Sequence, residues 1–329
     1  FGFLGSGALR SRDAVGGTGN YGMLDQRAAM QWVNRNIACF GGDPKRVMLA
    51  GQSAGGASVY YHLVAPRSWG LFSRAVAMSG GFAATLPQAE AADFETTFEL
   101  VVNITGCNRA KFKAVSKEVA EDEEDTDEDG DSEDGDKDTS SAMEQQRASQ
   151  VVCLEQLPAS QILRAWRKLQ FHPEVRFDPV VDNVDLTSSV AKLMRRGQVA
   201  PGVPLIAGAT SEDLDYPLWH APKVILACDA APSLCTKGHF IDFVQGLRPY
   251  LSWSDAEAAS AVAAYSQPFE LPSGGDLGHW YWAARKMGTD STMICPARRS
   301  AKWISAANSG SAPAYVYTFQ HRPDGPSGS

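Results

Sequence analysis

Short apolar runs alternate with longer amphipathic segments along this chain of 329 residues. Apolar residues recur near helical spacing over residues 22–39, and residues 293–307 form a second such segment. The apolar runs are too short for helices and are typical of buried strands, at residues 46–50, 74–78, 203–208 and 314–319. Helices that alternate with continuously apolar strands predict an α/β fold, with a mostly parallel sheet covered by helices on both faces.

The segment of residues 119–146 departs from this pattern. From Glu121 it holds no apolar residue before Ala142, and residues 121–138 contain 13 acidic residues and one lysine. Repulsion between like charges and the lack of apolar surface to bury predict a disordered, solvated insertion. An acidic interaction tail and a cation-binding loop are alternatives, although the segment does not follow the EF-hand pattern.

The negative charge of the chain lies in this insertion. The whole chain has a net charge of −8, whereas the chain without residues 121–138 has a net charge of +4. Basic residues do not gather with aromatic residues elsewhere, so nucleic-acid binding has no support. The chain has no run of 18 apolar residues and no cluster with metal-ligand spacing. We therefore expect no transmembrane segment, no metal and no cofactor.

A Gly-x-Ser-x-Gly motif, Gly51 to Gly55, follows the strand predicted at residues 46–50. A strand, a tight turn and a helix in this order are the setting in which a serine becomes a nucleophile, so Ser53 is the candidate. The tight turn needs small residues two positions before and two positions after the serine, and we expect Gly51 and Gly55 to meet this need. The backbone N–H of Ala54 is a candidate oxyanion donor at the start of the next helix. The alternative is an ordinary serine in a loop or helix cap.

The residues around the motif extend it on both sides. Gly19 to Arg27 leads into the first predicted helix, and Phe40 to Val47 leads into the strand before Ser53. Together with the motif, these blocks resemble the type-B carboxylesterase and cholinesterase family of α/β hydrolases. The resemblance implies one α/β-hydrolase domain over residues 1–329, truncated at both ends and interrupted by the insertion at residues 119–146.

The triad acid of such a hydrolase follows a later core strand. In the resembling family, the strand that matches residues 203–208 is followed by Asp-Glu-Gly, and the Glu is the acid. The matching residues here are Glu212, Asp213 and Leu214, and the acid position falls on Asp213. Because Asp is shorter than Glu by one methylene, Glu212 remains the alternative acid.

A catalytic base is missing from the chain. The six histidines are His62, His172, His220, His239, His279 and His321, and none lies in the Gly-x-x-His-x-x-Glu setting of the family. His321 follows the last predicted strand but matches a His-Arg-Pro that is not the base. The family also supplies oxyanion donors from a loop upstream of residue 1. We therefore expect the parent protein to be active and this fragment to be nearly inactive.

The resemblance implies hydrolysis of a small carboxylic ester by the parent protein, through an acyl intermediate on Ser53. Gln52 stands where the family usually has Glu, and this loss of a negative charge favours a general carboxylesterase or lipase over a choline esterase. A non-catalytic, cholinesterase-like adhesion or scaffold protein is the alternative. A peptidase of another branch is disfavoured by the block from Gly19 to Arg27. The family also implies a structural ion pair between Arg27 and Asp43.

Cysteine positions bear on the compartment. By the resemblance, Cys107 and Cys153 form a disulfide that closes a surface loop around the insertion. Cys228 and Cys235 are a possible local pair or two free thiols, and Asn103 begins a glycosylation sequon. These features together favour a secreted protein or one of the secretory pathway. The oligomeric state is not predicted.

Overall fold

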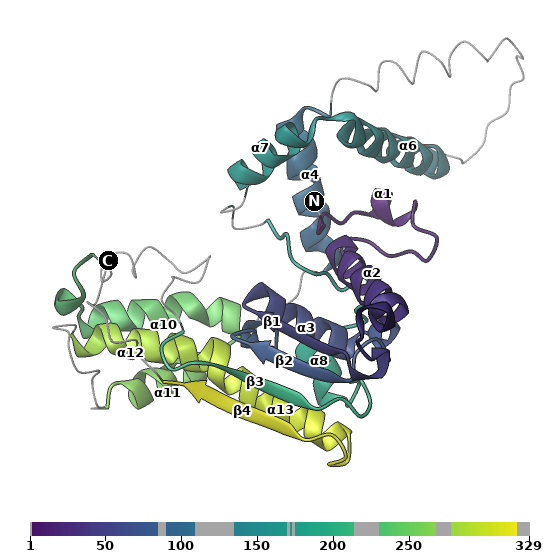
Figure 1. Ribbon diagram of the computed structural model, residues 1–329. Helices are drawn as coiled ribbons and strands as arrows, with labels where there is room; N and C mark the ends of the chain where they lie inside the picture. Colours follow the sequence, from purple (N-terminus) through teal and green to yellow (C-terminus); the bar gives the residue numbers. More distant parts are fainter. Residues whose placement is uncertain are drawn as a thin grey trace, which may run out of the picture. The chain divides into compact units, whose positions relative to one another are not determined.

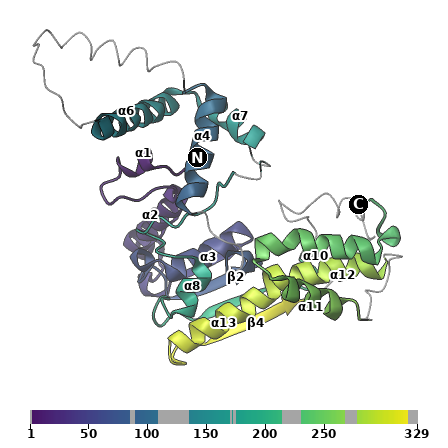
Figure 2. The ribbon, with the colours of Figure 1, turned by 180° about the vertical axis from the view of Figure 1, so that it is seen from behind.

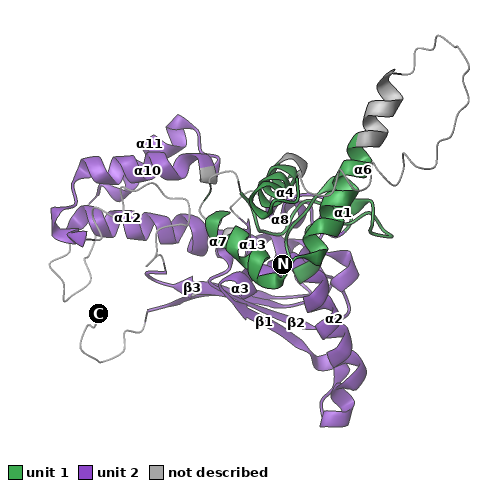
Figure 3. Ribbon diagram, turned by 90° about the horizontal axis from the view of Figure 1, so that it is seen from above, with its two compact units in different colours: residues 1–22, 89–184 green, residues 23–88, 185–329 purple. Residues whose placement is uncertain are grey.

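The structure is a computed structural model that describes most of the chain (Figure 1). The described residues are 2–84, 90–108, 135–169, 172, 175–213, 230–267 and 278–320. Contacts divide the chain into two compact units, shown in green and purple in Figure 3. Unit 1 contains residues 1–22 and 89–184, and unit 2 contains residues 23–88 and 185–329. Each unit is considered by itself below.

Unit 2 contains a parallel sheet of four strands in the order β1-β2-β3-β4. The strands are β1 (Met48–Gln52), β2 (Arg74–Met78), β3 (Leu205–Thr210) and β4 (Ala314–Phe319). All four coincide with or overlap the predicted strands, so the predicted α/β class is confirmed. The first strand begins at Met48 rather than at residue 46 because Pro44–Arg46 forms a 3-10 turn.

One face of the sheet carries two helices, α3 (Ala54–Val64) and α13 (Cys295–Ala307). Helix α3 contacts β1 and β2, whereas α13 contacts β3 and β4, and the short helix α8 (Val190–Arg195) contacts both helices (Figures 1 and 2). Small and apolar side chains are buried on this face, at Ala75, Ala77, Leu205, Ala207 and Ala209. The alternate positions Ile206, Tyr315 and Phe319 are 44%, 61% and 53% exposed. The central strands thus bury the side chains that face α3 and α13.

The two predicted helices are present with shifted ends. Helix α2 (Tyr21–Asn36) continues into a 3-10 turn (Ile37–Phe40) and stops at Gly41, which has φ 79°. Residues Asp290–Ile294 form a π-helix, so α13 begins at Cys295 rather than at residue 293. Short 3-10 turns complete the described part of this unit, at Pro66–Ser68, Gly81–Ala84 and Pro232–Leu234.

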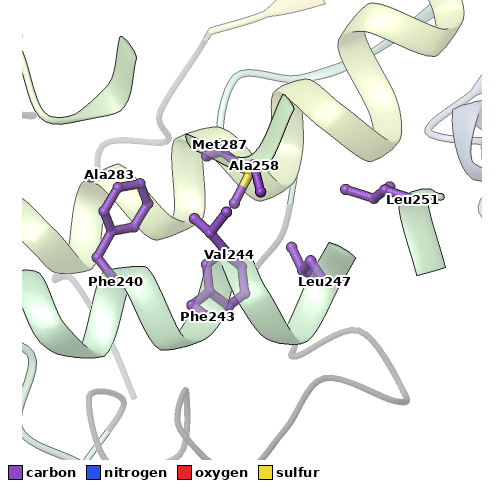
Figure 4. Packing of buried hydrophobic residues seen from close by; sticks show 8 residues of the cluster. All are labelled: Phe240, Phe243, Val244, Leu247, Leu251, Ala258, Ala283 and Met287. Atoms are coloured by element: carbon purple, nitrogen blue, oxygen red, sulfur yellow. The ribbon is translucent and has the colours of Figure 1, made fainter. Parts of the chain in front are cut away.

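Three further helices of unit 2, between β3 and β4 in the chain, were not predicted. They are α10 (Lys237–Leu251), α11 (Asp255–Tyr265) and α12 (His279–Thr289). Their buried side chains form one apolar cluster, in which α10 packs on α11 and α12 (Figure 4). The cluster contains Phe240, Phe243, Val244, Leu247, Leu251, Ala258, Ala283 and Met287. This packing fixes the position of α12 against α10 and α11.

Unit 1 is helical in its described part. It contains α1 (Gly7–Arg10), α4 (Ala91–Thr105), α6 (Gly135–Gln156) and α7 (Ala159–Leu169). A disulfide joins Cys107 and Cys153, which confirms the predicted pairing. Both cysteines pack with apolar residues of α4 and α6, among them Phe98 and Val151.

The insertion predicted at residues 119–146 is described only from residue 135 on. Residues 119–134 lie outside the described residues. Residues 135–146 form the first half of α6, and the disorder of the insertion stays a prediction. The acidic run ends at Asp138, and helix-forming residues such as Ala142 and Glu144 lead into a segment anchored by the buried Val151.

The second predicted cysteine pair is described in part. Cys235 is disulfide-bonded, whereas Cys228, the partner predicted for it, lies outside the described residues. Leu214, which follows the two candidate acids, also lies outside them. Among the helices of the described ranges, none combines the length and the apolar character needed to cross a membrane.

Candidate active site

Ser53 lies at a strained turn between β1 and α3. Its backbone has φ 55° and ψ −121°, in a region that residues with a Cβ atom rarely adopt. The N–H of Ser53 donates to the carbonyl oxygen of Met78 at 2.9 Å, which fastens the turn to the end of β2. Ser53 is exposed. The strand, turn and helix predicted around this serine are therefore present, with the geometry of a nucleophile elbow.

Glycines allow the backbone to approach itself closely at this turn. A Cβ atom on Gly51 would lie 2.2 Å from the carbonyl oxygen of Gly55, so Gly51 cannot carry a side chain here. A Cβ atom on Gly55 would meet nothing within 4 Å. The expectation that both residues must lack bulk thus holds for Gly51 and is wrong for Gly55. Gly56 and Gly80 are further close contacts, because a Cβ atom on Gly80 would lie 2.2 Å from the backbone of Gly56.

Ala54 is the first residue of α3 and is exposed. The first N–H groups of a helix have no partner within the helix, and they lie at the positive end of its dipole. The N–H of Ala57 donates to the carbonyl oxygen of Ser53 at 2.9 Å, which starts the helix directly at the serine. The Ala54 N–H thus stays available beside Ser53 for an anionic oxygen.

Asp213 lies three residues beyond the end of β3. Its Oδ2 atom accepts hydrogen bonds from the hydroxyl of Ser79 and, at 3.0 Å, from the backbone N–H of Thr210. Ser79 directly follows β2, has φ 50° and is 8% exposed. Ser79 was not predicted as a site residue, although its position at the end of a core strand was a usable signal. Two donors on one oxygen orient this carboxylate and leave Oδ1 for another donor.

Three adjacent strands bring these residues to one edge of the sheet. Ser53 follows β1, Ser79 follows β2 and Asp213 follows β3, all at the carboxyl ends of the strands. Neighbouring strands are about 4.8 Å apart, so the carboxyl ends of β1 and β3 lie roughly 10 Å apart with β2 between them. That separation leaves room for one imidazole ring between a hydroxyl and a carboxylate. Ligand sites of open α/β sheets lie at this edge.

Burial lowers the pKa of Arg285 on α12, and the charge of Glu212, the alternative acid, opposes this with a smaller effect. The Arg285 guanidinium lies over the rings of Tyr281 and Trp282. Of the two neighbouring carboxylates, Asp213 is the one that accepts a hydrogen bond from Ser79.

A tyrosine of β4 is also near the candidate acid. Burial and the charge of Asp213 raise the pKa of the Tyr317 hydroxyl. Tyr317 pairs with Gly208 of β3 in the sheet, and a Cβ atom on Gly208 would lie 2.5 Å from the Tyr317 ring. A larger residue at position 208 would collide with the Tyr317 ring.

The histidines described in unit 2 have contacts other than Ser53. His62 is fully buried in α3, His239 caps the start of α10, and His279 begins α12 with its ring against Trp280. His172 belongs to unit 1. His220 and His321 lie outside the described residues.

His62 takes part in a buried polar network instead. Its ring nitrogens contact Ser68 Oγ at 2.9 Å and Gln26 Oε1 at 3.0 Å. Burial, with a smaller effect of the Arg27 charge, lowers the pKa of His62 to about 4. The ring is therefore neutral at pH 7 and serves the packing of α3.

Arg27 belongs to the same network. It donates to Ser68 at 3.0 Å and to Asp185 at 2.7 Å, and Arg27 and Asp185 are 7% and 6% exposed. The predicted ion pair between Arg27 and Asp43 is wrong. Asp43 instead caps the turn Pro44–Arg46, where its carboxylate accepts a hydrogen bond from the N–H of Lys45.

Comparison with known proteins gives consistent matches. The model of the carboxylesterase family matches residues 1–328. A cocaine esterase of Oryctolagus cuniculus is 28% identical over 93% of this chain and 47% of its own length, and a cholinesterase of Mus musculus is 27% identical over 92% of the chain and 43% of its own length. A pyrethroid hydrolase of Rattus norvegicus is 45% identical over 30% of the chain and 17% of its own length. The chain spans less than half the length of these relatives.

Proposed function

Since the chain belongs to the carboxylesterase family, we propose that the complete protein hydrolyses carboxylic esters through an acyl intermediate on Ser53. The observation that carries this proposal is the exposed serine at a strained turn between a parallel strand and a helix. Named esterases among its relatives support the reaction class. The intact motif disfavours the non-catalytic alternative.

In the proposed reaction, the Ser53 hydroxyl attacks the acyl carbon and loses its proton to a histidine, and the alcohol leaves with that proton. Water then attacks the acyl-serine, which releases the acid and restores the hydroxyl. Asp213 orients the histidine and stabilises its charge, and the Ala54 N–H donates to the oxyanion. We propose that the base is a histidine of the complete protein that lies outside these 329 residues.

Hydrolysis of p-nitrophenyl butyrate by the complete gene product tests this proposal. We expect turnover that Ser53→Ala lowers on the order of 10⁵-fold or more, because the nucleophile is lost. The 329-residue chain by itself should be nearly inactive, because one oxyanion donor remains without a positioned base. A complete protein that folds but turns over as slowly as its Ser53→Ala variant would contradict the proposal.

We propose a neutral ester as the substrate. Gln52, next to the nucleophile, is exposed and uncharged. A choline ester therefore lacks one electrostatic attraction at this position. The relatives include a cocaine esterase, a cholinesterase and a pyrethroid hydrolase, so their names alone do not select the ester. The ratio of kcat/KM for butyrylcholine to kcat/KM for an uncharged isostere tests the preference. Gln52→Glu should raise this ratio, because it adds a negative charge that attracts the choline group.

We propose a secretory location, with a glycan on Asn103. The Cys107–Cys153 disulfide supports an oxidising compartment. Asn103 is exposed near the end of α4. A mobility shift on treatment with a glycosidase, absent in Asn103→Gln, would support the glycan. We also propose that both units belong to one hydrolase domain, since the family model covers both.

A further inference from the structure

The carboxylate of Asp213 is held at the edge of the sheet by two donors that come from two different strands. The hydroxyl of Ser79, which directly follows β2, donates to its Oδ2 atom. The N–H of Thr210, the last residue of β3, donates to the same atom at 3.0 Å. Two donors on one oxygen fix the position of the carboxylate, so the direction in which Oδ1 points is fixed as well.

The backbone of Ser79 determines where this hydroxyl lies. Its N–H donates to the carbonyl oxygen of Gly208 at 2.7 Å, which joins the end of β2 to β3. Ser79 is 8% exposed and has φ 50°, a conformation that glycine adopts without strain and that other residues rarely adopt. Glycine would suit this turn better if the backbone alone mattered. A strained serine whose hydroxyl is hydrogen-bonded therefore indicates a role for the side chain.

The positions of the two donors suit a short acid. Asp213 accepts from a backbone N–H only three residues earlier, so its side chain turns back onto the strand that it follows. Glu has one methylene more, so its carboxylate would lie roughly 1.5 Å farther from the same backbone. A carboxylate displaced by that distance could not keep the hydrogen bonds to both Ser79 and Thr210.

We propose that Ser79 is a positioning residue, which together with the Thr210 N–H adapts this site to an Asp rather than a Glu as its acid. This inference rests on the proposed function. Ser79 does not touch the ester, and it acts through Asp213, whose Oδ1 atom accepts from the histidine. The site thereby requires Asp at position 213, although the resemblance to the family leads one to expect Glu there.

Two substitutions at Ser79 separate positioning from folding, in the complete gene product with p-nitrophenyl butyrate as substrate. Ser79→Ala and Ser79→Gly both remove the hydroxyl, but only glycine relieves the positive φ, so Ser79→Gly should have the higher melting temperature. We expect both to lower kcat about tenfold, since misplacement of a catalytic group is costly. KM should stay within about twofold, because Ser79 does not contact the ester.

The matched control is Ser73→Ala, at the other end of β2. It removes a hydroxyl that donates to the carbonyl oxygen of Val47 at 3.1 Å, far along the strand from the site. This variant should change kcat less than about twofold, because its hydrogen bond does not reach the acid.

A double-mutant cycle with Asp213→Glu tests the length of the acid. We expect Asp213→Glu to lower kcat about tenfold or more in the otherwise wild-type protein, because the longer side chain loses its donors. In the presence of Ser79→Ala the same change should lower kcat about threefold or less, since the hydrogen bond to Ser79 is already gone.

The outcomes separate this proposal from the proposed function. A wild-type protein without Ser53-dependent turnover overturns both. Turnover in the wild type with an unchanged kcat in Ser79→Gly overturns the positioning role alone, because a loss in Ser79→Ala would then come from the backbone. So does an Asp213→Glu variant as active as the wild type, or a pair of losses that simply multiply in the double mutant.

Discussion

At the scale of single residues, the candidate site depends on two serines whose backbones have unusual conformations. Ser53 and Ser79 both have positive φ angles, and both directly follow a strand of the sheet. The conformation costs free energy, on the order of 1–3 kcal/mol at each residue, which the hydrogen bonds to neighbouring strands offset. These bonds run from Ser53 to Met78 and from Ser79 to Gly208.

Asp213, rather than Glu212, is the acid that we expect to matter. Asp213→Asn should lower the kcat for ester hydrolysis on the order of 10³–10⁴-fold, because an amide cannot stabilise the imidazolium. Glu212→Gln should lower it far less. Steady-state kinetics of both variants gives the comparison, and the opposite order would assign the acid to Glu212.

His62 makes stability depend on pH. Its pKa in the folded protein is about 4, below its value of 6.5 in the unfolded chain, so the unfolded chain binds more protons between these values. Stability is therefore full above pH 6.5 and falls as the pH drops toward 4, by about 3 kcal/mol from this residue. Urea denaturation at several pH values measures the slope.

The matched variant for this measurement is His62→Asn, which keeps a polar side chain but does not titrate. We expect a lower stability and a flatter dependence between pH 6.5 and 4. If the slope of His62→Asn equals that of the wild type, another group is responsible for the acid sensitivity.

At the scale of elements, the turn from β1 to α3 contains two glycines whose replacement should have different effects. Gly51→Ala should lower the melting temperature by several degrees and abolish turnover, because the new methyl group collides with the Gly55 backbone. Gly55→Ala should leave the melting temperature within about one degree, since its methyl group meets nothing. Differential scanning calorimetry compares the two variants, and equal losses would contradict the packing described.

The elements that were predictable are those with local signals. The four strands were predicted because each is a short apolar run, and Ser53 because its motif joins a strand to a helix. The choice of Asp213 as the candidate acid followed from counting along the chain from Gly208, and its role stays a prediction. In contrast, α10 and α12 meet through residues such as Phe240 and Met287, which only the fold brings together.

Long-range partners explain the remaining differences. Asp185, the true partner of Arg27, is 158 residues away in the sequence, and Ser79 is 134 residues from Asp213. The sequence patterns used here report spacing within one element, so they could not identify either pair.

At the scale of the whole molecule, the site belongs to one unit. Ser53, Ser79 and Asp213 all lie in unit 2. The disulfide Cys107–Cys153 and the sequon at Asn103 lie in unit 1. The chain spans less than half the length of the relatives it matches, so the complete gene product is the proper object for measuring activity.

The most direct test of the account is covalent labelling of the complete gene product with a fluorophosphonate, followed by mass spectrometry of its peptides. The account predicts one adduct on Ser53, which disappears in Ser53→Ala and forms slowly in Asp213→Asn. A folded protein that acquires no adduct on Ser53, or acquires it only on another serine, would contradict the claim that this turn presents the nucleophile.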